Sequence, residues 1–229
     1  MKIKGSKRFK KLLETIKDKK SLKISDVIPL VKNNCTTKFD ESIDVSVLLN
    51  LKQKKEELSL RTVVNLPHGS GKKVRVAVLC EEGKNDEAKK SGADVFGSDT
   101  LVSDITSGKI NFDKLVATPA MMSKMGKLGK ILGPKGLMPN PKLGTVTNNL
   151  EAIVKALKTG QIEIKNDKDG NVGASIGKKS FSNDKIKENF DTFMQTILKE
   201  KPIKIKGDFI LSTFLTSTMG ISYKLKLEK

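Results

Sequence analysis

The hydrophobic pattern of this chain changes character twice along its 229 residues, and that change limits the folds it can adopt. From Ile43 to Leu51, apolar side chains alternate with polar ones, which is typical of a strand with one buried face. Residues 74–79 are almost continuously apolar, as in a strand that is covered on both faces. After Gly160 the alternating pattern returns. The two ends of the chain therefore resemble each other, and the middle differs from both.

The middle of the chain alternates between strand and helix patterns. This order predicts a parallel sheet with helices packed on its faces. The expected strands are residues 74–79, 93–96 and 114–117, and the expected helices are residues 85–91, one capped by Ser98 or Asp99, and one starting at Thr147.

We therefore expect two domains that combine α/β and α+β structure. Residues 1–66 plus 160–229 are predicted to form a discontinuous α+β sandwich domain made from both termini, and residues 67–159 an inserted Rossmann-like α/β domain. The connections near residues 66–71 and 158–161 are candidate hinges.

Two helices are expected in the outer domain. One is predicted to begin with Ser25 as its N-cap. The other is amphipathic and turns one apolar stripe inward, made of Ile186, Phe190, Phe193, Ile197 and Leu198.

The charge of the chain indicates a polyanionic partner. There are 44 Lys+Arg against 26 Asp+Glu, a net charge of +18, and all but three of the bases are lysine. Lysine holds phosphates well but reads base edges less specifically than the arginine fork, so the charge favours contact with a nucleic-acid backbone. We find neither a signal-peptide pattern nor an apolar run of about 20 residues, so no membrane partner is expected.

Catalytic and metal chemistry have little support. The chain has one histidine, His68, and two cysteines, Cys35 and Cys80, that form no CxxC pair. Neither a Walker A loop nor a G-x-G-x-x-G motif is present. We therefore expect no metal, no cofactor and no enzymatic activity.

Residues 118–147 are the least ordinary segment. They hold five of the 18 glycines, four of the seven prolines and five lysines, but no acid. Glycine exposes the backbone and proline stiffens turns, so we interpret the segment as a basic loop that faces a phosphate backbone. A solvated loop without a partner is the alternative. The lysines of residues 118–147 are Lys124, Lys127, Lys130, Lys135 and Lys142.

Three short motifs in the outer domain are ambiguous from the residues alone. KFDES (residues 38–42) precedes a strand, and Phe39 there is best explained by core packing. EIKNDKDG (163–170) is typical of a hairpin turn. TSTMG (216–220) is a polar strand connection, although its hydroxyls and glycine suit contact with a ribose 2′-hydroxyl.

These motifs, taken in order, resemble one family. GKLGKILGPKGLMPNPKLGTV (126–146) closely resembles the signature of the ribosomal protein L-one family of the large subunit, in its bacterial type. LPHGSGKKVRVAV (66–78), SGADVFG (91–97) and the three outer motifs match that family in the same order. Two departures are that Ile221 stands where the family usually has proline, and that Lys135 and Lys165 stand where arginine is common.

The resemblance implies a function in the ribosome. A member of this family binds 23S-type rRNA in the mobile stalk beside the tRNA exit site and assists the release of deacylated tRNA. Bacterial members also repress translation of their own operon by binding an mRNA leader. The expected partners are therefore the large ribosomal subunit, exit-site tRNA and that leader, and the free protein is expected to be a cytoplasmic monomer.

The resemblance also implies site residues. The implied rRNA contacts are Lys38, Phe39, Ser42, Asn166, Lys168, Ser175, Gly177, Lys178, Thr216, Ser217, Thr218, Met219 and Gly220. We expect the five lysines of residues 118–147 to form a second contact with RNA or tRNA. Two alternatives remain open: an RNA-modifying enzyme with a Rossmann-like domain, and a cationic protein that coats unrelated RNAs equally well.

Overall fold

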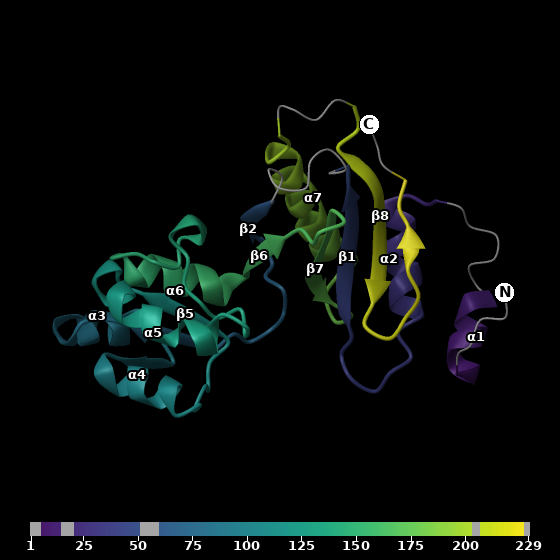
Figure 1. The fold of residues 1–229 in the computed structure, drawn as a ribbon. Helices are drawn as coiled ribbons and strands as arrows, with labels where there is room; N and C mark the ends of the chain where they lie inside the picture. Colours follow the sequence, from purple (N-terminus) through teal and green to yellow (C-terminus); the bar gives the residue numbers. More distant parts are fainter. Residues whose placement is uncertain (1–5, 15–20, 51–59, 203–206, 227–229) are drawn as a thin grey trace. The chain divides into compact units, whose positions relative to one another are not determined.

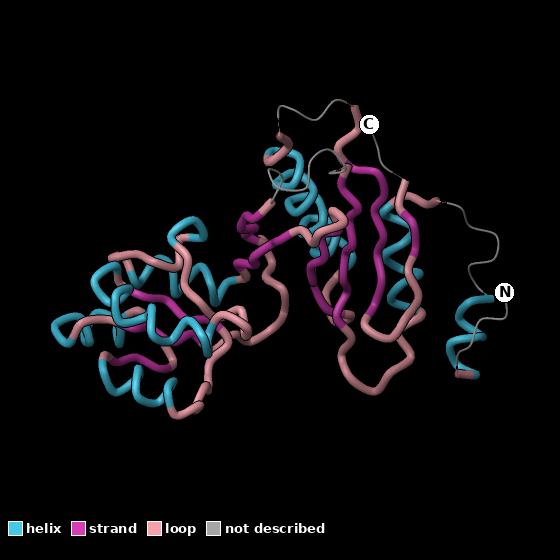
Figure 2. Tube along the Cα trace, in the orientation of Figure 1, coloured by secondary structure: helices cyan, strands magenta, loops and turns pink. Residues whose placement is uncertain are grey.

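The computed structural model describes residues 6–14, 21–50, 60–202 and 207–226. The chain divides into two compact units, the first made of Met1–Gly71 with Ile162–Lys229 and the second of Lys72–Gln161. Both units mix helices and strands, as Figure 2 shows. The predicted combination of α/β and α+β structure is confirmed.

The first unit is built on a four-stranded antiparallel sheet (Figure 1). Its strands, in spatial order, are β7 (Asn171–Lys178), β1 (Ser42–Leu49), β8 (Ile210–Ser217) and β9 (Tyr223–Lys224). Alternate residues of β1 are buried from Ile43 to Leu49, as the sequence pattern predicts, whereas Leu51 lies outside the described residues. Strand β1, from the N-terminal part of the chain, therefore lies between two strands from the C-terminal part.

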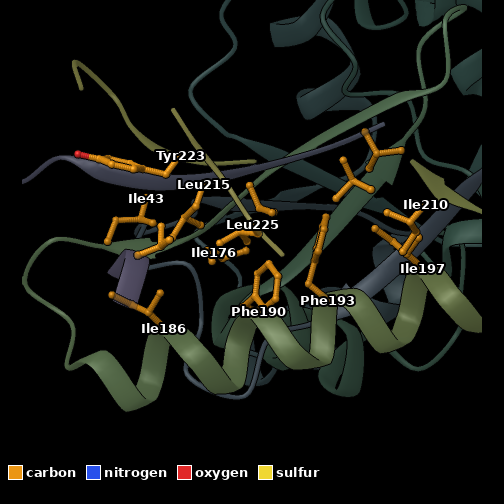
Figure 3. Packing of buried hydrophobic residues seen from close by; sticks show 14 of the residues in the cluster. Ile43, Ile176, Ile186, Phe190, Phe193, Ile197, Ile210, Leu215, Tyr223 and Leu225 are labelled. Atoms are coloured by element: carbon orange, nitrogen blue, oxygen red, sulfur yellow. The ribbon is translucent and has the colours of Figure 1, made fainter. Parts of the chain in front are cut away.

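Helices cover one face of this sheet. They are α2 (Ile24–Asn33) and α7 (Asn183–Lys199), whereas α1 (Lys7–Glu14) contributes its buried Leu12 to the same hydrophobic core. Figure 3 shows Ile186, Phe190, Phe193 and Ile197 of α7 pointing into the core, where they are buried. The inward apolar stripe predicted for this helix is therefore confirmed in all but one residue, Leu198.

Two details of these helices differ from the sequence prediction. Leu198 is 51% exposed, because one residue beyond Ile197 the helix has turned by about 100° away from the core. Ser25 lies inside α2 and the N-cap is Lys23, which has extended backbone and no side-chain capping bond. Burial of Val27, Ile28 and Val31, rather than a cap, holds this helix in place.

A two-stranded sheet forms where the chain leaves and re-enters the first unit. It pairs β2 (Arg61–Asn65) with β6 (Gln161–Lys165). The Arg61 guanidinium lies 2.8 Å from the Glu163 carboxylate across these strands.

The second unit is a parallel α/β sheet in the order β4 (Val95–Gly97), β3 (Val76–Leu79), β5 (Lys114–Ala117). One face packs against α4 (Asp99–Thr106) and α5 (Met122–Leu132). The other packs against α3 (Asn85–Lys90), which follows the short η1 (Glu82–Lys84), and α6 (Leu150–Thr159). This double coverage explains why every residue of β3 is buried.

The basic segment 118–147 is not the continuous loop that its composition suggests. It contains η2 (Pro119–Met121), α5 and η3 (Pro141–Leu143). Met125, Leu128 and Leu132 are spaced three and four residues apart and are buried against the sheet, and this burial outweighs the two glycines inside the helix. The next helix, α6, begins at Leu150 rather than Thr147, because the Asn149 side chain caps it by accepting from the Ala152 amide.

Candidate nucleic-acid interface

Three loops emerge at the same end of the four-stranded sheet. Strand β1 begins at Ser42, which pairs with Lys178 at the end of β7, and Ile43 pairs with Ser217 at the end of β8. The predicted site residues of KFDES, of the end of β7 and of TSTMG are therefore neighbours. We call residues 36–42, 177–180 and 216–220 the strand-end surface.

Ser42 and Thr218 join two of these loops. The Thr218 amide donates to the Ser42 carbonyl oxygen at 3.1 Å, and the Ser42 amide donates to Thr218 Oγ1 at 3.0 Å. The threonine side chain thus continues the strand ladder one residue beyond β8. A ribose 2′-hydroxyl would have to compete with Ser42 for the Thr218 hydroxyl.

Glu41 is a buried carboxylate beneath the surface. Its oxygens accept from the Met219 amide at 3.1 Å, from the Thr37 hydroxyl at 2.8 Å and from the Thr37 amide at 3.3 Å. Burial by itself would raise the pKa of Glu41, but the hydroxyls of Ser217 and Thr37 and the amides of Met219 and Thr37 hold this pKa below its usual value. The charged carboxylate therefore ties the KFDES loop to TSTMG.

Asp40 ties the same loop to the end of β7. Its carboxylate accepts from the Ser180 amide at 3.1 Å and from the Ser180 hydroxyl at 2.8 Å. The loop around Phe39 is consequently fixed on two sides, by Asp40 and by Glu41.

Two large apolar side chains project from these fixed loops into solvent. Phe39 is 53% exposed and Met219 is 48% exposed, although most large apolar side chains of the described residues are buried. The core-packing interpretation of Phe39 is therefore wrong. An exposed apolar pair on rigid loops, with Lys38 and Lys178 in the same surface, is typical of a contact surface.

Glycine is required where TSTMG ends. A Cβ atom on Gly220 would lie 2.3 Å from Ser217 Oγ. Ser217 itself is only 3% exposed, so it supports the turn from below, and Gly177 is buried beside Phe181. Ser217 and Gly177 are therefore the predicted contact residues that are least accessible to a ligand.

The strand-end surface does not include every predicted residue. Asn166 and Lys168 lie in the turn before β7, where Asp167 accepts from the Asp169 and Asn171 amides at 3.0 and 2.7 Å. The side chain and amide of Asn171 lower the pKa of Asp167. Because β7 runs from Asn171 to Lys178, this turn is about 23 Å from the other end of the sheet.

Between the two ends lies the sheet face that the helices leave uncovered. Ser175 and Thr216 both pair with Asp44 there. Burial raises the pKa of Asp44, and the Ser175 hydroxyl opposes that rise. The face therefore carries hydroxyl groups around a single half-buried acid.

Arg8 was not predicted from the sequence. Its guanidinium donates to the Met219 carbonyl oxygen at 2.9 Å and to Thr36 Oγ1 at 2.9 Å. Arg8 and Met219 are 211 residues apart, so no local motif could have revealed this contact.

The second predicted contact lies wholly in the second unit. Lys124, Lys127 and Lys130 are on α5, Lys142 is in η3, and Lys135 lies between these elements. Lys124 forms an ion pair with Asp99 at 2.6 Å. The other four side chains are exposed and have no ion pair within the part of the chain that the structure describes.

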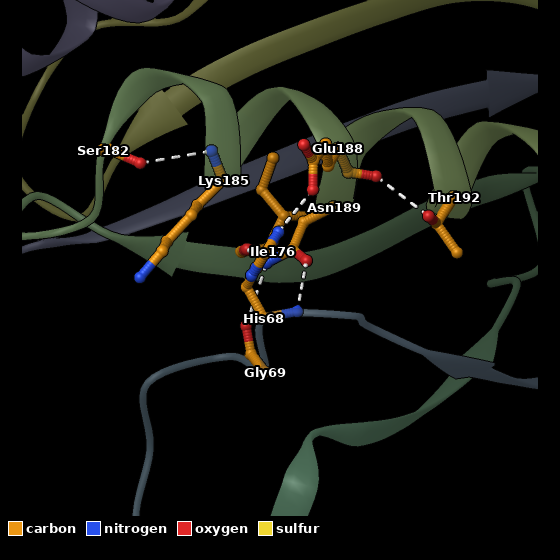
Figure 4. Close-up of polar contacts among 8 residues, drawn as sticks. All are labelled: His68, Gly69, Ile176, Ser182, Lys185, Glu188, Asn189 and Thr192. Atoms are coloured by element: carbon orange, nitrogen blue, oxygen red, sulfur yellow. Dashed lines mark hydrogen bonds and ion pairs between the residues drawn. The ribbon is translucent and has the colours of Figure 1, made fainter.

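Hydrogen bonds hold part of the first predicted hinge, residues 66–71, to helix α7. Asn189 of α7 is fully buried, and its Nδ2 donates to the carbonyl oxygens of Gly69 at 2.9 Å and Ile176 at 2.7 Å (Figure 4). Its Oδ1 accepts from the His68 amide at 3.1 Å, and His68 Nε2 lies 2.5 Å from the Glu188 carboxylate. His68 therefore has a structural contact at this junction.

The described ranges hold neither a cluster of metal-ligating side chains nor a membrane-spanning helix. They contain no group of three or more His, Cys, Asp or Glu side chains placed to hold a metal ion. None of the helices in those ranges has the length and apolar character needed to cross a bilayer.

Comparison with known proteins gives a consistent result. Residues 31–221 match the model of the ribosomal protein L1p/L10e family. The chain is 57% identical over 225 residues to the large ribosomal subunit protein uL1 of Pelagibacter ubique (strain HTCC1062), which covers 98% of both chains. It is 40% identical to the protein of that name from Rickettsia peacockii (strain Rustic) and from Rickettsia conorii (strain ATCC VR-613 / Malish 7), over 99% of this chain and 95% of theirs.

Proposed function

The chain belongs to the ribosomal protein L1p/L10e family, and from that premise we propose that its strand-end surface binds 23S-type rRNA in the mobile stalk beside the tRNA exit site. Membership makes the chain a structural, non-enzymatic constituent of the large ribosomal subunit. The RNA-modifying enzyme considered from the sequence is thereby excluded.

The observation that supports this proposal best is the exposure of Phe39 and Met219 on loops that two carboxylates hold. Unstacked bases and riboses of a folded RNA pack on such apolar side chains, whereas phosphates need cations. Lys38 and Lys178 supply cations in the same surface. Preformed loops lose little conformational entropy on binding, which favours affinity.

The decisive experiment is a competition assay with the full chain. A stalk rRNA fragment and a scrambled RNA of equal length compete for the protein, and the variant Phe39→Ala/Met219→Ala is compared with the wild type. We expect the double variant to lose at least about 30-fold in affinity for the stalk fragment, because each of the two lost apolar contacts with a base contributes roughly 1 kcal/mol or more.

Leu198→Ala is the matched control for this assay. Leu198 is 51% exposed, close to Met219 in exposure, but it lies near the far end of α7. The Leu198→Ala variant should bind the stalk fragment as the wild type does. Equal binding of stalk and scrambled RNA by the wild type would instead favour a protein that coats RNA without selectivity.

We extend the proposal to the two other RNAs that the family resemblance implies. The mRNA leader of the chain's own operon would occupy the strand-end surface, so Met219→Ala should weaken leader and stalk binding in parallel. Release of deacylated tRNA would use Lys127, Lys130, Lys135 and Lys142 of the second unit. Replacing these four lysines with alanine should lower tRNA binding and leave stalk binding largely unchanged.

A further inference from the structure

Arg8 differs from the other two arginines in the groups to which its guanidinium donates. Of the three arginines, Arg61 pairs with Glu163 and Arg75 lies 4.0 Å from Asp113. Within the described residues, Arg8 has no such carboxylate partner. Its two terminal nitrogens donate instead to neutral oxygens, the Met219 carbonyl and Thr36 Oγ1, each at 2.9 Å.

These two bonds connect the loops of the strand-end surface. Thr36 belongs to the loop that carries Phe39, and Met219 carries the other exposed apolar side chain. Arg8 therefore bridges the two loops from helix α1.

The backbone of Met219 is consequently held at both of its polar groups. Its amide donates to Glu41 Oε2 at 3.1 Å, and its carbonyl accepts from Arg8. An acid and a base thus fix the residue whose side chain points into solvent. The two backbone bonds set the direction of the Met219 side chain and leave the side chain itself available for contact with RNA.

We propose that Arg8 is a positioning residue of the RNA-binding surface, which fixes Met219 relative to the Phe39 loop so that both apolar side chains meet the RNA together. The proposal rests on the proposed function. It gives α1 a role beyond burying Leu12 in the core, because this helix holds the guanidinium in place.

A positioning role can be separated from a direct phosphate contact. A phosphate contact depends on charge, so lysine would replace arginine, and its loss would reduce the salt dependence of binding by about one ionic contact. Positioning depends on the planar fork, which reaches two divergent acceptors and which the lysine ammonium does not reproduce. Its loss lowers affinity at every salt concentration by the same factor.

The experiment measures the affinity of the full chain for the stalk rRNA fragment at several salt concentrations. The variants are Arg8→Ala, Arg8→Lys and Thr36→Val, which removes one acceptor and nearly keeps the shape. Lys10→Ala is the control, because it removes the same charge from an exposed position of the same helix. Thermal unfolding checks that each variant is folded.

We expect Arg8→Ala and Arg8→Lys to lose about tenfold each with an unchanged salt slope, and Thr36→Val to lose less in the same direction. Wild-type affinity of Arg8→Lys would overturn the proposal, as would a loss in Arg8→Ala with a lower salt slope. Failure of the wild type itself to prefer stalk over scrambled RNA would refute the proposed function instead, so the two failures are distinct.

Discussion

Glu41 combines complete burial with a negative charge, a combination that usually destabilises a protein. Here its two oxygens satisfy the Met219 and Thr37 amides and the Thr37 hydroxyl. Buried donors without acceptors are costly, so the carboxylate stabilises two loops at once. The sequence places Glu41 one residue before a strand but says nothing about Met219, which is 178 residues away.

The pKa of Glu41 gives this arrangement a pH signature. Because its pKa is lower in the folded protein than the unfolded reference of 4.5, the unfolded chain takes up the proton first as the pH falls. The stabilisation is therefore complete above that reference and is lost as the pH falls through the folded pKa. Glu41→Gln should lower the free energy of unfolding by about 1–3 kcal/mol at pH 7, and by less at pH 3, which lies below the unfolded reference.

Urea unfolding at both pH values tests this expectation. Glu151→Gln is the control, because Glu151 forms an exposed pair with Lys155 on α6 and should contribute little. A Glu41→Gln deficit that is equally large at pH 3 would show that charge is not the cause.

Gly220 gives a second prediction for a single residue. Alanine there would place Cβ 2.3 Å from Ser217 Oγ, so the turn must shift. We expect Gly220→Ala to destabilise the protein by about 1–2 kcal/mol and to weaken stalk RNA binding.

The double variant Ser217→Ala/Gly220→Ala isolates the cause. Removing the hydroxyl leaves Ser217 Cβ at 3.5 Å, an ordinary contact, so binding should recover relative to Gly220→Ala. Gly173→Ala serves as the control, because its nearest atom, Val45 O, is 3.9 Å away. No recovery in the double variant would mean that the backbone of Gly220, and not this clash, matters.

Elements were predictable where burial follows one simple period. The alternation after Ile43 and the apolar run of β3 both indicate strands, because each strand has a constant number of covered faces. Helix α5 was missed, since its glycines and lysines obscure an apolar stripe of only three buried residues. Strand β8 was recognised only as a neighbour of TSTMG.

Helix α5 yields a prediction at this scale. Added Cβ atoms on Gly126 and Gly129 would meet nothing within 4 Å, and neither residue has a positive φ. Gly126→Ala/Gly129→Ala should therefore stabilise the protein by about 1–2 kcal/mol through helix propensity. If the bare backbone beside Lys127 and Lys130 admits tRNA closely, the same variant should bind tRNA more weakly.

Thermal unfolding and tRNA titration separate these two effects. Gly133→Ala is the contrasting variant, because its Cβ would lie 2.6 Å from the Gly129 carbonyl oxygen and should destabilise the helix end. Stabilisation without any loss of tRNA binding would show that the two glycines do not take part in the second contact. It would not exclude the lysines from that contact.

For the whole molecule, the return of the alternating pattern after Gly160 was the most informative signal, because only a sheet shared by both ends accounts for it economically. The site was less predictable. Family resemblance supplied most of its residues, but the bonds that fix them run from Arg8 to Met219 and from Asp40 to Ser180. Contacts over such separations follow from the finished fold and leave no local pattern.

Because both ends of the chain build the four-stranded sheet, a long internal deletion should harm the fold less than a short C-terminal truncation. Strands β7, β1, β8 and β9 share one sheet, whereas the second unit has its own sheet and its own core. Replacing Lys72–Gln161 by a short Gly/Ser linker removes no strand of the four and no residue of the strand-end surface. We expect that shortened protein to fold and to bind stalk RNA selectively, because loop closure costs little for a linker whose ends already belong to one unit.

Truncation after Gly207 removes far fewer residues but should do more damage. It deletes β8 and β9, leaves the β8 side of β1 without a partner and removes Met219 from the surface. Circular dichroism and the stalk competition assay on both shortened proteins check these expectations. If the internal deletion failed to fold while the truncated chain stayed folded, the sheet would not depend on both chain ends, and the strand-end surface could not form as described.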